Sequence, residues 1–392
     1  MFRRSRTVQS RHSRGFRSRR GFALMMALGA LVILAVLIAG STYISIQESR
    51  LGQNQLVQSR AFAVAEYGLN KIQADWDKTP NLQMENGASF DTTYILAGQG
   101  TCAVRYTRLN NETFWIVSKG EAVVGNSLSR SRTAVKRMGA VLRLRIPTIK
   151  ANAAVTTAGN VVVKGSPQIR GMNQVPAGWT GCTAAPDKAG LVTSPTATVT
   201  IQNANQVVGS PNVATDPLAA DQNTYVKFGD ETWNTLTSAP NVSLAGGSYG
   251  SAIGPTVTAG SCAKENLFNW GEPNRSGTGL VPECYNYFPI IYVAGDLALN
   301  GNGRGQGILL INGNLQINGT FDWTGLIVTA GKILKGNGSA TVTGAIMAAE
   351  AEVTDELQGN LTVNYSACGL ERAMRGSAQV VQARERAWAE IY

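Results

Sequence analysis

Residues 290–307, IIYVAGDLALNGNGRGQG, begin a repeat that continues as ILLINGNLQINGTFDWTG (308–325), LIVTAGKILKGNGSATVTG (326–344) and AIMAAEAEVTDELQGNLTV (345–363). Ile291, Leu309, Ile327 and Ile346 occupy equivalent positions, at steps of 18, 18 and 19 residues. Glycine and asparagine mark the corners between the short apolar runs. Short apolar strands at a fixed period predict a parallel β-solenoid, in which successive coils stack about 4.8 Å apart.

Two earlier segments repeat the same pattern, AVTTAGNVVVKGSPQIRG at 154–171 and ATVTIQNANQVVGSPNV at 197–213. They share a Gly-Ser-Pro corner, at 165–167 and at 209–211. We therefore expect these segments to form further coils of the same solenoid.

The remaining parts of the predicted solenoid region, 150–368, are irregular. Residues 214–288 are rich in glycine, asparagine and aromatic side chains, so we expect an insertion there. The ends of a stacked sheet expose unpaired backbone groups that must be covered. Because residues 369–392 have a composition that favours a helix, we expect them to form a C-terminal helix or cap.

The N-terminal lead is strongly basic. Residues 1–20 hold eight arginines and no acidic residue, so the net charge of +10 falls to +2 for the remainder of the chain. Positive charge beside an apolar segment sets membrane orientation, with the arginines on the cytoplasmic side. A nucleic-acid partner is not expected, because the basic residues are confined to this lead.

An apolar segment follows the lead directly. No charged residue occurs from Gly21 to Gln47, and Phe22 to Gly40 is almost continuously apolar, long enough to cross about 30 Å of hydrocarbon. A cleaved signal peptide has a shorter apolar region of about 7 to 15 residues, although Ala39 and Ser41 resemble a signal-peptidase site. We expect a single-pass membrane helix.

The helix is predicted to continue well beyond the membrane. The first proline of the chain is Pro80, and apolar side chains recur at steps of 3 and 4 residues at Phe62, Ala65, Leu69, Ile72 and Trp76. This spacing predicts one helix over 22–77, with an apolar first half and an amphipathic second half that needs a partner surface.

Two segments near the N-terminus form a recognisable pattern: RRGFALMMALGALVILAVLIAG (19–40) and QESRLGQNQLVQSRAFAVAEYGLNKIQADW (47–76). Together they resemble the N-terminal region of type IV pilin-like minor pilins of the PilX kind. In that family a basic leader ends in glycine, an aromatic residue follows, and the helix carries an AF-x-x-AE-x-GL motif. Here the motif residues are Ala61, Phe62, Ala65, Glu66, Gly68 and Leu69.

The resemblance implies a processed subunit of a filament. Residues 1–21 would be a prepilin leader, cleaved by a prepilin peptidase between Gly21 and Phe22, and Phe22 would be N-methylated. The partners implied are the prepilin peptidase, the inner membrane, and the other pilins and minor pilins of the filament. The protein would first be a single-pass inner-membrane protein and later part of a pilus at the cell surface.

Met26 departs from the pattern of major pilins, which carry a glutamate at this fifth mature position. A carboxylate at the bilayer centre costs about 2.5 to 3.5 kcal/mol unless it is paired, and in major pilins its partner is a neighbour's amino terminus. Methionine removes both the cost and the pairing. The resemblance therefore implies a subunit that initiates or caps a filament.

A small antiparallel sheet is predicted over 81–147. The strand-like segments are TCAVRYTRL (101–109), TFWIVSKGEAVVG (113–125) and RTAVKRMGAVLRLRI (132–146). Their alternation predicts one buried face, which includes Val104, Tyr106, Trp115, Val117, Leu142 and Leu144. The helix end around Leu69, Ile72 and Trp76 is the expected cover of that face.

Side chains suited to catalysis are scarce. The single histidine, His12, lies in the basic lead, which excludes Ser-His-Asp catalysis and histidine-ligated zinc from the folded region. Neither a metal nor a cofactor is expected. The best enzymatic alternative is a glycan lyase or hydrolase, with candidate acids and bases at Asp296, Asp322, Glu350, Glu352, Asp355, Glu356, Lys332 and Lys335. These residues do not recur at matched coil positions, so we expect solvent-facing charges and no enzyme.

Cysteine and aromatic residues leave alternatives open. Five scattered cysteines allow two disulfides and one unpaired thiol, with Cys262 and Cys284 the nearest pair in the sequence. The sequence does not fix the connectivity. The aromatic residues of the head are expected mainly in the core, and a sugar-binding patch is the alternative: Trp233, Trp270, Tyr285, Tyr287 and Trp323.

The expected fold is α+β to mainly β: a long transmembrane and stalk helix, a small antiparallel sheet and a β-solenoid head with an insertion. The expected function is that of a minor-pilin-like subunit in pilus assembly or priming, with a head for adhesion or motility and a surface or glycan ligand. The alternative is a permanently anchored β-solenoid adhesin or scaffold of the cell envelope.

Overall fold

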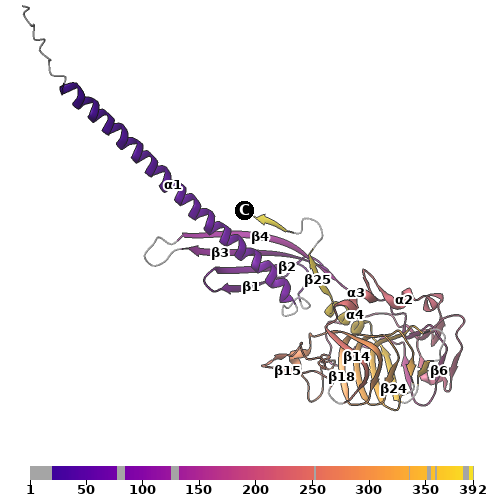
Figure 1. The fold of residues 1–392 in the computed structure, drawn as a ribbon. Coiled ribbons are helices and arrows are strands. Elements are labelled where there is room, and N and C mark those ends of the chain that lie inside the picture. Colours follow the sequence, from indigo (N-terminus) through magenta and orange to yellow (C-terminus); the bar gives the residue numbers. More distant parts are fainter. Residues whose placement is uncertain are drawn as a thin grey trace, which may run out of the picture.

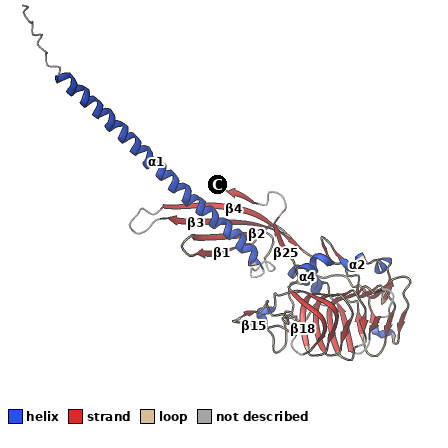
Figure 2. Cartoon of the chain, viewed as in Figure 1, coloured by secondary structure: helices blue, strands red, loops and turns tan. Residues whose placement is uncertain are grey.

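The chain forms a long helix, an antiparallel sheet packed on part of that helix, and a head built on a large parallel sheet (Figure 1). Figure 2 shows that, apart from helix α1 and a few short helices, the regular structure of the chain consists of strands. The computed structural model describes residues 20–76, 84–124, 132–250, 253–334, 336–350, 355–357, 360–382 and 388–391.

Helix α1 (Arg20–Ala74) runs for 55 residues without interruption. Its side chains are exposed throughout 23–46, and Val57 is the first that is buried. From there to Trp76 one face of the helix packs on the antiparallel sheet (Figure 1). The predicted two halves of the helix are therefore distinct in the structure.

The antiparallel sheet runs in the order β1, β2, β3, β4, and two C-terminal strands pair with the far side of β4. Its strands are β1 (Ser89–Leu96), β2 (Gly100–Arg108), β3 (Thr113–Val124), β4 (Arg132–Arg145), β25 (Gln379–Gln382) and β26 (Trp388–Ile391). Leu69, Ile72 and Trp76 cover one face of the sheet, as predicted. No strand was predicted for β1.

One strand has the opposite phase from the prediction. Val104, Tyr106, Leu142 and Leu144 are buried under the helix as expected. On β3, however, Phe114 and Ile116 are fully buried, and Trp115 and Val117 lie half-exposed on the other face. The small residues Ser118 and Gly120 share the helix-facing side with Phe114 and Ile116, so this phase lets the helix approach the sheet closely.

The head repeats the register that the sequence pattern predicts. Its central strands are β17 (Ile290–Leu299), β18 (Gly303–Ile311), β20 (Thr320–Thr329) and β22 (Ser339–Ala348), and all of them pair in parallel. Ile291 lies opposite Leu309, Leu309 opposite Ile327, and Ile327 opposite Ile346. The repeat of 18 or 19 residues is therefore one step in a curved, solenoid-like parallel sheet.

Polar side chains join successive corners of the head. The Asn314 backbone N–H donates to the Asp296 carboxylate at 2.7 Å, and the Lys332 backbone N–H donates to the Asn314 side-chain oxygen at 3.0 Å. At the other corner the Asn318 amide donates to the Asn300 amide oxygen at 2.8 Å. The bonds at the first corner satisfy backbone N–H groups, and the bond at the second corner joins two side chains.

The order of strands in the head differs from their order in the chain. Along the ladder that contains Ile291 the strands are β14 (Val242–Tyr249), β17, β18, β20, β22, β5 (Ala153–Thr157), β8 (Ala189–Thr193) and β11 (Val213–Thr215). The early repeats thus stack on β22, the last of the late repeats. The chain enters the middle of the stack at β5, leaves one end at β11, and re-enters at the other end at β14.

The neighbouring ladders follow the same permuted order. β24 (Asn360–Tyr365) pairs with β22 on one side and with β7 (Gln168–Arg170) on the other, and β7 pairs with β10 (Val207–Val208). A separate parallel sheet joins β23 (Asp355–Leu357), β6 (Val161–Val163) and β9 (Val199–Ile201). β17 also pairs with β19 (Leu315–Ile317), which pairs with β21 (Ile333–Leu334).

The predicted insertion contains short elements and the end strand β14. The elements are α2 (Asn223–Val226), β12 (Lys227–Phe228), β13 (Glu231–Thr232), α3 (Trp233–Ser238), β15 (Val257–Thr258) and β16 (Ser261–Cys262), with 3-10 turns at η3 (Pro217–Ala220) and η4 (Pro282–Cys284). A further 3-10 turn, η2 (Ala204–Gln206), precedes the insertion. No strand was predicted for β14 or for the end of β11, because the composition of 214–288 is irregular and does not show the apolar repeat.

The C-terminal prediction is only partly correct. Helix α4 (Ala367–Gly376) packs against β18, β20 and β22, but residues 379–382 and 388–391 form strands on β4 of the antiparallel sheet. They are not a helix because β4 offers an unpaired edge, which these residues fill.

Candidate functional site

The first half of α1 presents a continuous apolar surface. Exposed large apolar side chains extend from Leu24 to Ile46 along the helix. Among the described residues it is the one helix long and apolar enough to cross a membrane. This surface is consistent with single-pass anchoring.

The residues predicted for processing lie at the start of this helix. Gly21 and Phe22 belong to the first turn of α1, and the leader before Arg20 lies outside the described residues. Met26 is one turn further on, with its side chain 64% exposed. A side chain at position 26 therefore meets the surroundings of the helix and not the protein's own core.

The AF-x-x-AE-x-GL motif lies where the helix contacts the sheet. Ala61 and Ala65 are fully buried, and a Cβ added at Gly120 would lie 2.3 Å from the Ala61 carbonyl oxygen. A Cβ added at Gly68 would lie 2.3 Å from the Ser118 hydroxyl. Small residues on both surfaces therefore permit a very close approach.

The other motif residues flank this contact. Leu69 is buried in the same core, Phe62 packs on the edge of that core, and Glu66 is exposed. The alanines and the glycine of the motif thus have a packing role within one chain, while Glu66 is accessible to a neighbour.

The carboxylates of the head do not assemble into one site in the described part of the chain. Asp296 is exposed and caps a corner, whereas Asp322 lies half-buried in β20 with Arg304 opposite it on β18. Burial raises the pKa of Asp322, and the nearby Arg304 charge acts in the opposite direction. Glu350 follows the end of β22, nine residues beyond Thr341, which is the residue opposite Asp322.

The remaining candidate acids and bases add no cluster. The backbone N–H of Lys332 donates to a corner hydrogen bond, and Asp355 and Glu356 lie in strand β23. Glu352 and Lys335 lie outside the described residues. Within the described residues no group of three or more histidine, cysteine or acidic side chains is placed to hold a metal ion.

The aromatic candidates lie mainly in the core. Trp270 and Trp323 are fully buried and meet edge to face, with ring centroids 6.1 Å apart. Tyr287 is 7% exposed, and Trp233 is half-buried against the core. Tyr285 is partly exposed and contacts an arginine, which the sequence did not indicate.

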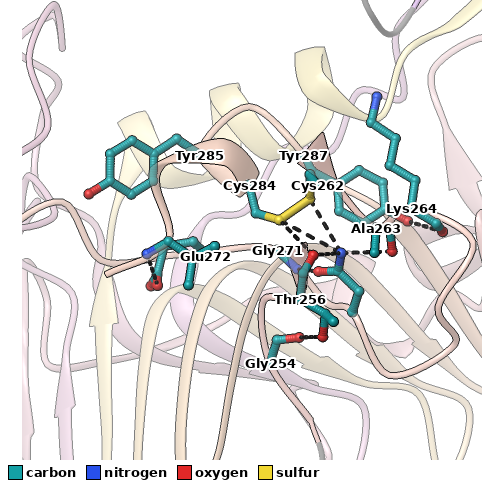
Figure 3. The surroundings of a disulfide bond; sticks show 12 residues. Gly254, Thr256, Cys262, Ala263, Lys264, Gly271, Glu272, Cys284, Tyr285 and Tyr287 are labelled. Carbon is teal, nitrogen blue, oxygen red and sulfur yellow. Dashed lines mark hydrogen bonds between the residues drawn. A yellow bond between two sulfur atoms is a disulfide. The ribbon is translucent and has the colours of Figure 1, made fainter. Parts of the chain in front are cut away.

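Two disulfides fasten the irregular parts of the head. Cys262 is bonded to Cys284 within the insertion, and Tyr285 and Tyr287 lie to either side of this bond in Figure 3. Cys182 is bonded to Cys368 at the start of α4, across a separation of 186 residues. Cys102 is a buried free thiol, and burial raises its pKa.

An arginine cluster that sequence reasoning missed lies between these disulfides. The guanidinium carbon of Arg275 lies 4.1 Å from the Tyr285 ring centroid and 4.9 Å from that of Trp179. The guanidinium carbon of Arg372 lies 4.9 Å from the same Trp179 ring. Burial lowers the pKa of Arg275 to about 10 and also lowers the pKa of Arg372.

No local pattern signals this cluster, because its members come from segments about 100 residues apart in the chain. The Cys182–Cys368 disulfide joins two of these segments covalently, but the sequence left that connectivity open.

Comparisons of the chain with protein-family models, with curated proteins and with solved structures give no match.

Proposed function

We propose that the chain is a minor-pilin-like subunit of a type IV pilus or a related filament. One observation carries this proposal: a single helix is apolar and exposed over its first half and packed on an antiparallel sheet over its second half. A simple membrane anchor needs only about 20 apolar residues and no rigid continuation into a folded domain. A helix that must leave the membrane and pack within a filament needs both halves.

The proposed route begins in the inner membrane. A prepilin peptidase cleaves between Gly21 and Phe22, Phe22 becomes N-methylated, and the stalk then packs with other pilins and minor pilins. Because Met26 lacks the carboxylate of a repeating subunit, this subunit initiates or caps the filament and takes a place at or near its tip.

The head is proposed to be a closed β-solenoid displayed on that stalk. The ladders on neighbouring faces, which advance together by one repeat at each step, support this closure. Its proposed role is adhesion or motility through a surface or glycan ligand.

A second candidate is a permanently anchored adhesin or scaffold of the cell envelope. The apolar surface of α1 supports it equally, because a membrane covers that surface as well as neighbouring helices do. A glycan-active enzyme is less favoured, since the candidate carboxylates among the described residues lie apart: Asp296 at a corner, Asp322 within β20, and Glu350 beyond the end of β22.

Mass spectrometry of the mature amino terminus distinguishes these functions. The filament proposal predicts a chain that starts at N-methylated Phe22. An intact Met1 would instead support the permanent anchor, and a start near Ser41 or Thr42 would identify a cleaved signal peptide.

The Met26→Glu variant tests the place in the filament. A glutamate here restores the charge of a repeating subunit, so we expect the variant to appear along the shaft, whereas the wild-type protein stays at filament ends. Gold labelling of sheared filaments measures the positions. Met25→Glu is the matched control, because Met25 is also exposed but lies one residue out of register. Unchanged placement of Met26→Glu would contradict the capping role.

A further inference from the structure

A cavity of about 300 Å³ lies between the Thr180–Gly181 loop, the insertion and α4. Arg275, Arg372 and Arg375 all line it. This volume is at the small end of ligand sites in proteins, and it is sufficient for one sugar-sized molecule.

The cavity has more positive than negative charge. Glu371 is the one carboxylate among the described residues that line it, and it pairs with Arg375 at 3.2 Å. Arg275 and Arg372 have neutral hydrogen-bond partners: the Tyr285 carbonyl accepts from Arg275 at 2.5 Å, and the Thr180 carbonyl accepts from Arg372. Burial disfavours the charged form of both guanidinium groups and lowers the pKa of each. Arg372 repels Arg275 and Arg375 repels Arg372, while Glu272 and Glu371 offset part of these costs. A bound anion would relieve both costs.

The arginines are held in place before any ligand arrives. The Trp179 ring contacts the guanidinium groups of both Arg275 and Arg372, and its indole N–H donates to the Pro273 carbonyl at 3.0 Å. The Cys182–Cys368 bond ties the loop after Trp179 to the start of α4. The Cys262–Cys284 bond lies directly before Tyr285 (Figure 3). A preorganised site loses less entropy on binding.

Arg372 retains hydrogen-bonding capacity toward the cavity. A guanidinium group has five N–H donors in a planar fork, and one interaction with Thr180 occupies part of this set. The fork matches a carboxylate, which accepts two parallel hydrogen bonds. Exposed Asn286 and Thr180 also line the cavity and provide amide and hydroxyl groups that suit a hydroxyl-bearing body.

We propose that this cavity binds an acidic sugar unit, a uronate, with its carboxylate on Arg372 and Arg375 and its ring beside Tyr285 and Asn286. This proposal gives the chemical class of the glycan ligand and rests on that part of the proposed function. Because the site is made by head residues alone, it is independent of processing at Gly21 and Phe22 and of the place in a filament.

Isothermal titration of the full chain in detergent tests the site, with glucuronate as the probe. Glucose has the same ring without the charge, and sulfate has charge without the ring. We expect saturable glucuronate binding at least about tenfold tighter than that of glucose or sulfate, since hydrogen bonds to a charged group are stronger than those between neutral groups. Arg372→Gln and Arg375→Gln should each weaken glucuronate binding by about tenfold or more.

Arg105→Gln is the matched control, because it removes the same charge from an exposed arginine of the antiparallel sheet and should leave glucuronate binding unchanged. Near-ultraviolet circular dichroism verifies that each variant is folded, and Arg375→Gln provides the test if Arg372→Gln is not. The proposal is overturned if glucuronate fails to bind, if glucose or sulfate binds as tightly, or if binding is insensitive to the folded arginine variants.

Discussion

Replacement of Gly120 by valine is expected to push the second half of α1 away from the antiparallel sheet, at a cost of about 3 kcal/mol or more. A Cβ at position 120 would lie 2.3 Å from the Ala61 carbonyl oxygen and 2.4 Å from the Ala65 backbone nitrogen. Both atoms belong to the helix backbone, so no side-chain rotation relieves the overlap. The helix must move, and the core under Leu69, Ile72 and Trp76 opens with it.

Thermal unfolding of the full chain in detergent measures this effect. For a helix–sheet unit of about 100 residues, a loss of about 3 kcal/mol lowers the melting temperature by about 12 to 24 °C. Gly247→Val is the matched control, because a Cβ added at Gly247 would have nothing within 4 Å. A Gly120→Val protein that unfolds at the wild-type temperature would contradict the close helix–sheet contact and the packing role of the motif alanines.

The repeat could be predicted from sequence to the level of individual residues. Ile291, Leu309, Ile327 and Ile346 lie in one ladder because each apolar run has a fixed length and each corner carries glycine or asparagine. The length of α1 could also be predicted, because the 54 residues after Arg20 contain no proline and apolar side chains continue along the helix.

The permuted order of the head could not be predicted. Every repeat has the same pattern, so the exposed edge of β22 is chemically suited to accept either a new strand or an earlier one. β22 pairs with β5, the first head strand after the antiparallel sheet. The periodicity of the sequence contains no information on where the chain enters the head, so it does not predict this pairing. Residues 154–171 and 345–363 lie far apart in the sequence, and the pattern of neither segment indicates that they are neighbours in the stack.

The prediction of which side chains of β3 are buried was wrong for a local reason. Residues 114–117 are Phe, Trp, Ile and Val, so no polar residue distinguishes the two faces of the strand. Small residues further along, Ser118 and Gly120, decide the phase by admitting the helix. The C-terminal strands were missed because their partner, the edge of β4, is more than 200 residues away in the chain.

Replacement of Val155 by aspartate is expected to unfold the head cooperatively, because the permuted order places β5 in the middle of the stack. Val155 is 1% exposed and lies between Ile346 of β22 and Leu191 of β8. An unpaired carboxylate there cannot reach water, and we expect a loss of about 4 kcal/mol or more. Val162→Asp is the matched control, since Val162 is half-exposed on β6 and should cost no more than about 1 kcal/mol.

Hydrogen exchange on the wild-type protein separates the permuted order from a serial one. In a serial stack β5 would be an edge strand, and alternate amides of Ala153–Thr157 would face water and exchange quickly. Between β22 and β8, all of these amides that donate across the ladder should instead be protected as strongly as those of β20. Fast exchange in β5 together with a stable Val155→Asp head would contradict the permuted stack. Strong protection of β5, together with loss of the folded head in Val155→Asp, would support direct pairing of the early repeats with β22. The connections from β4 to β5 and from α4 to β25 would then both leave the head from the middle of the stack.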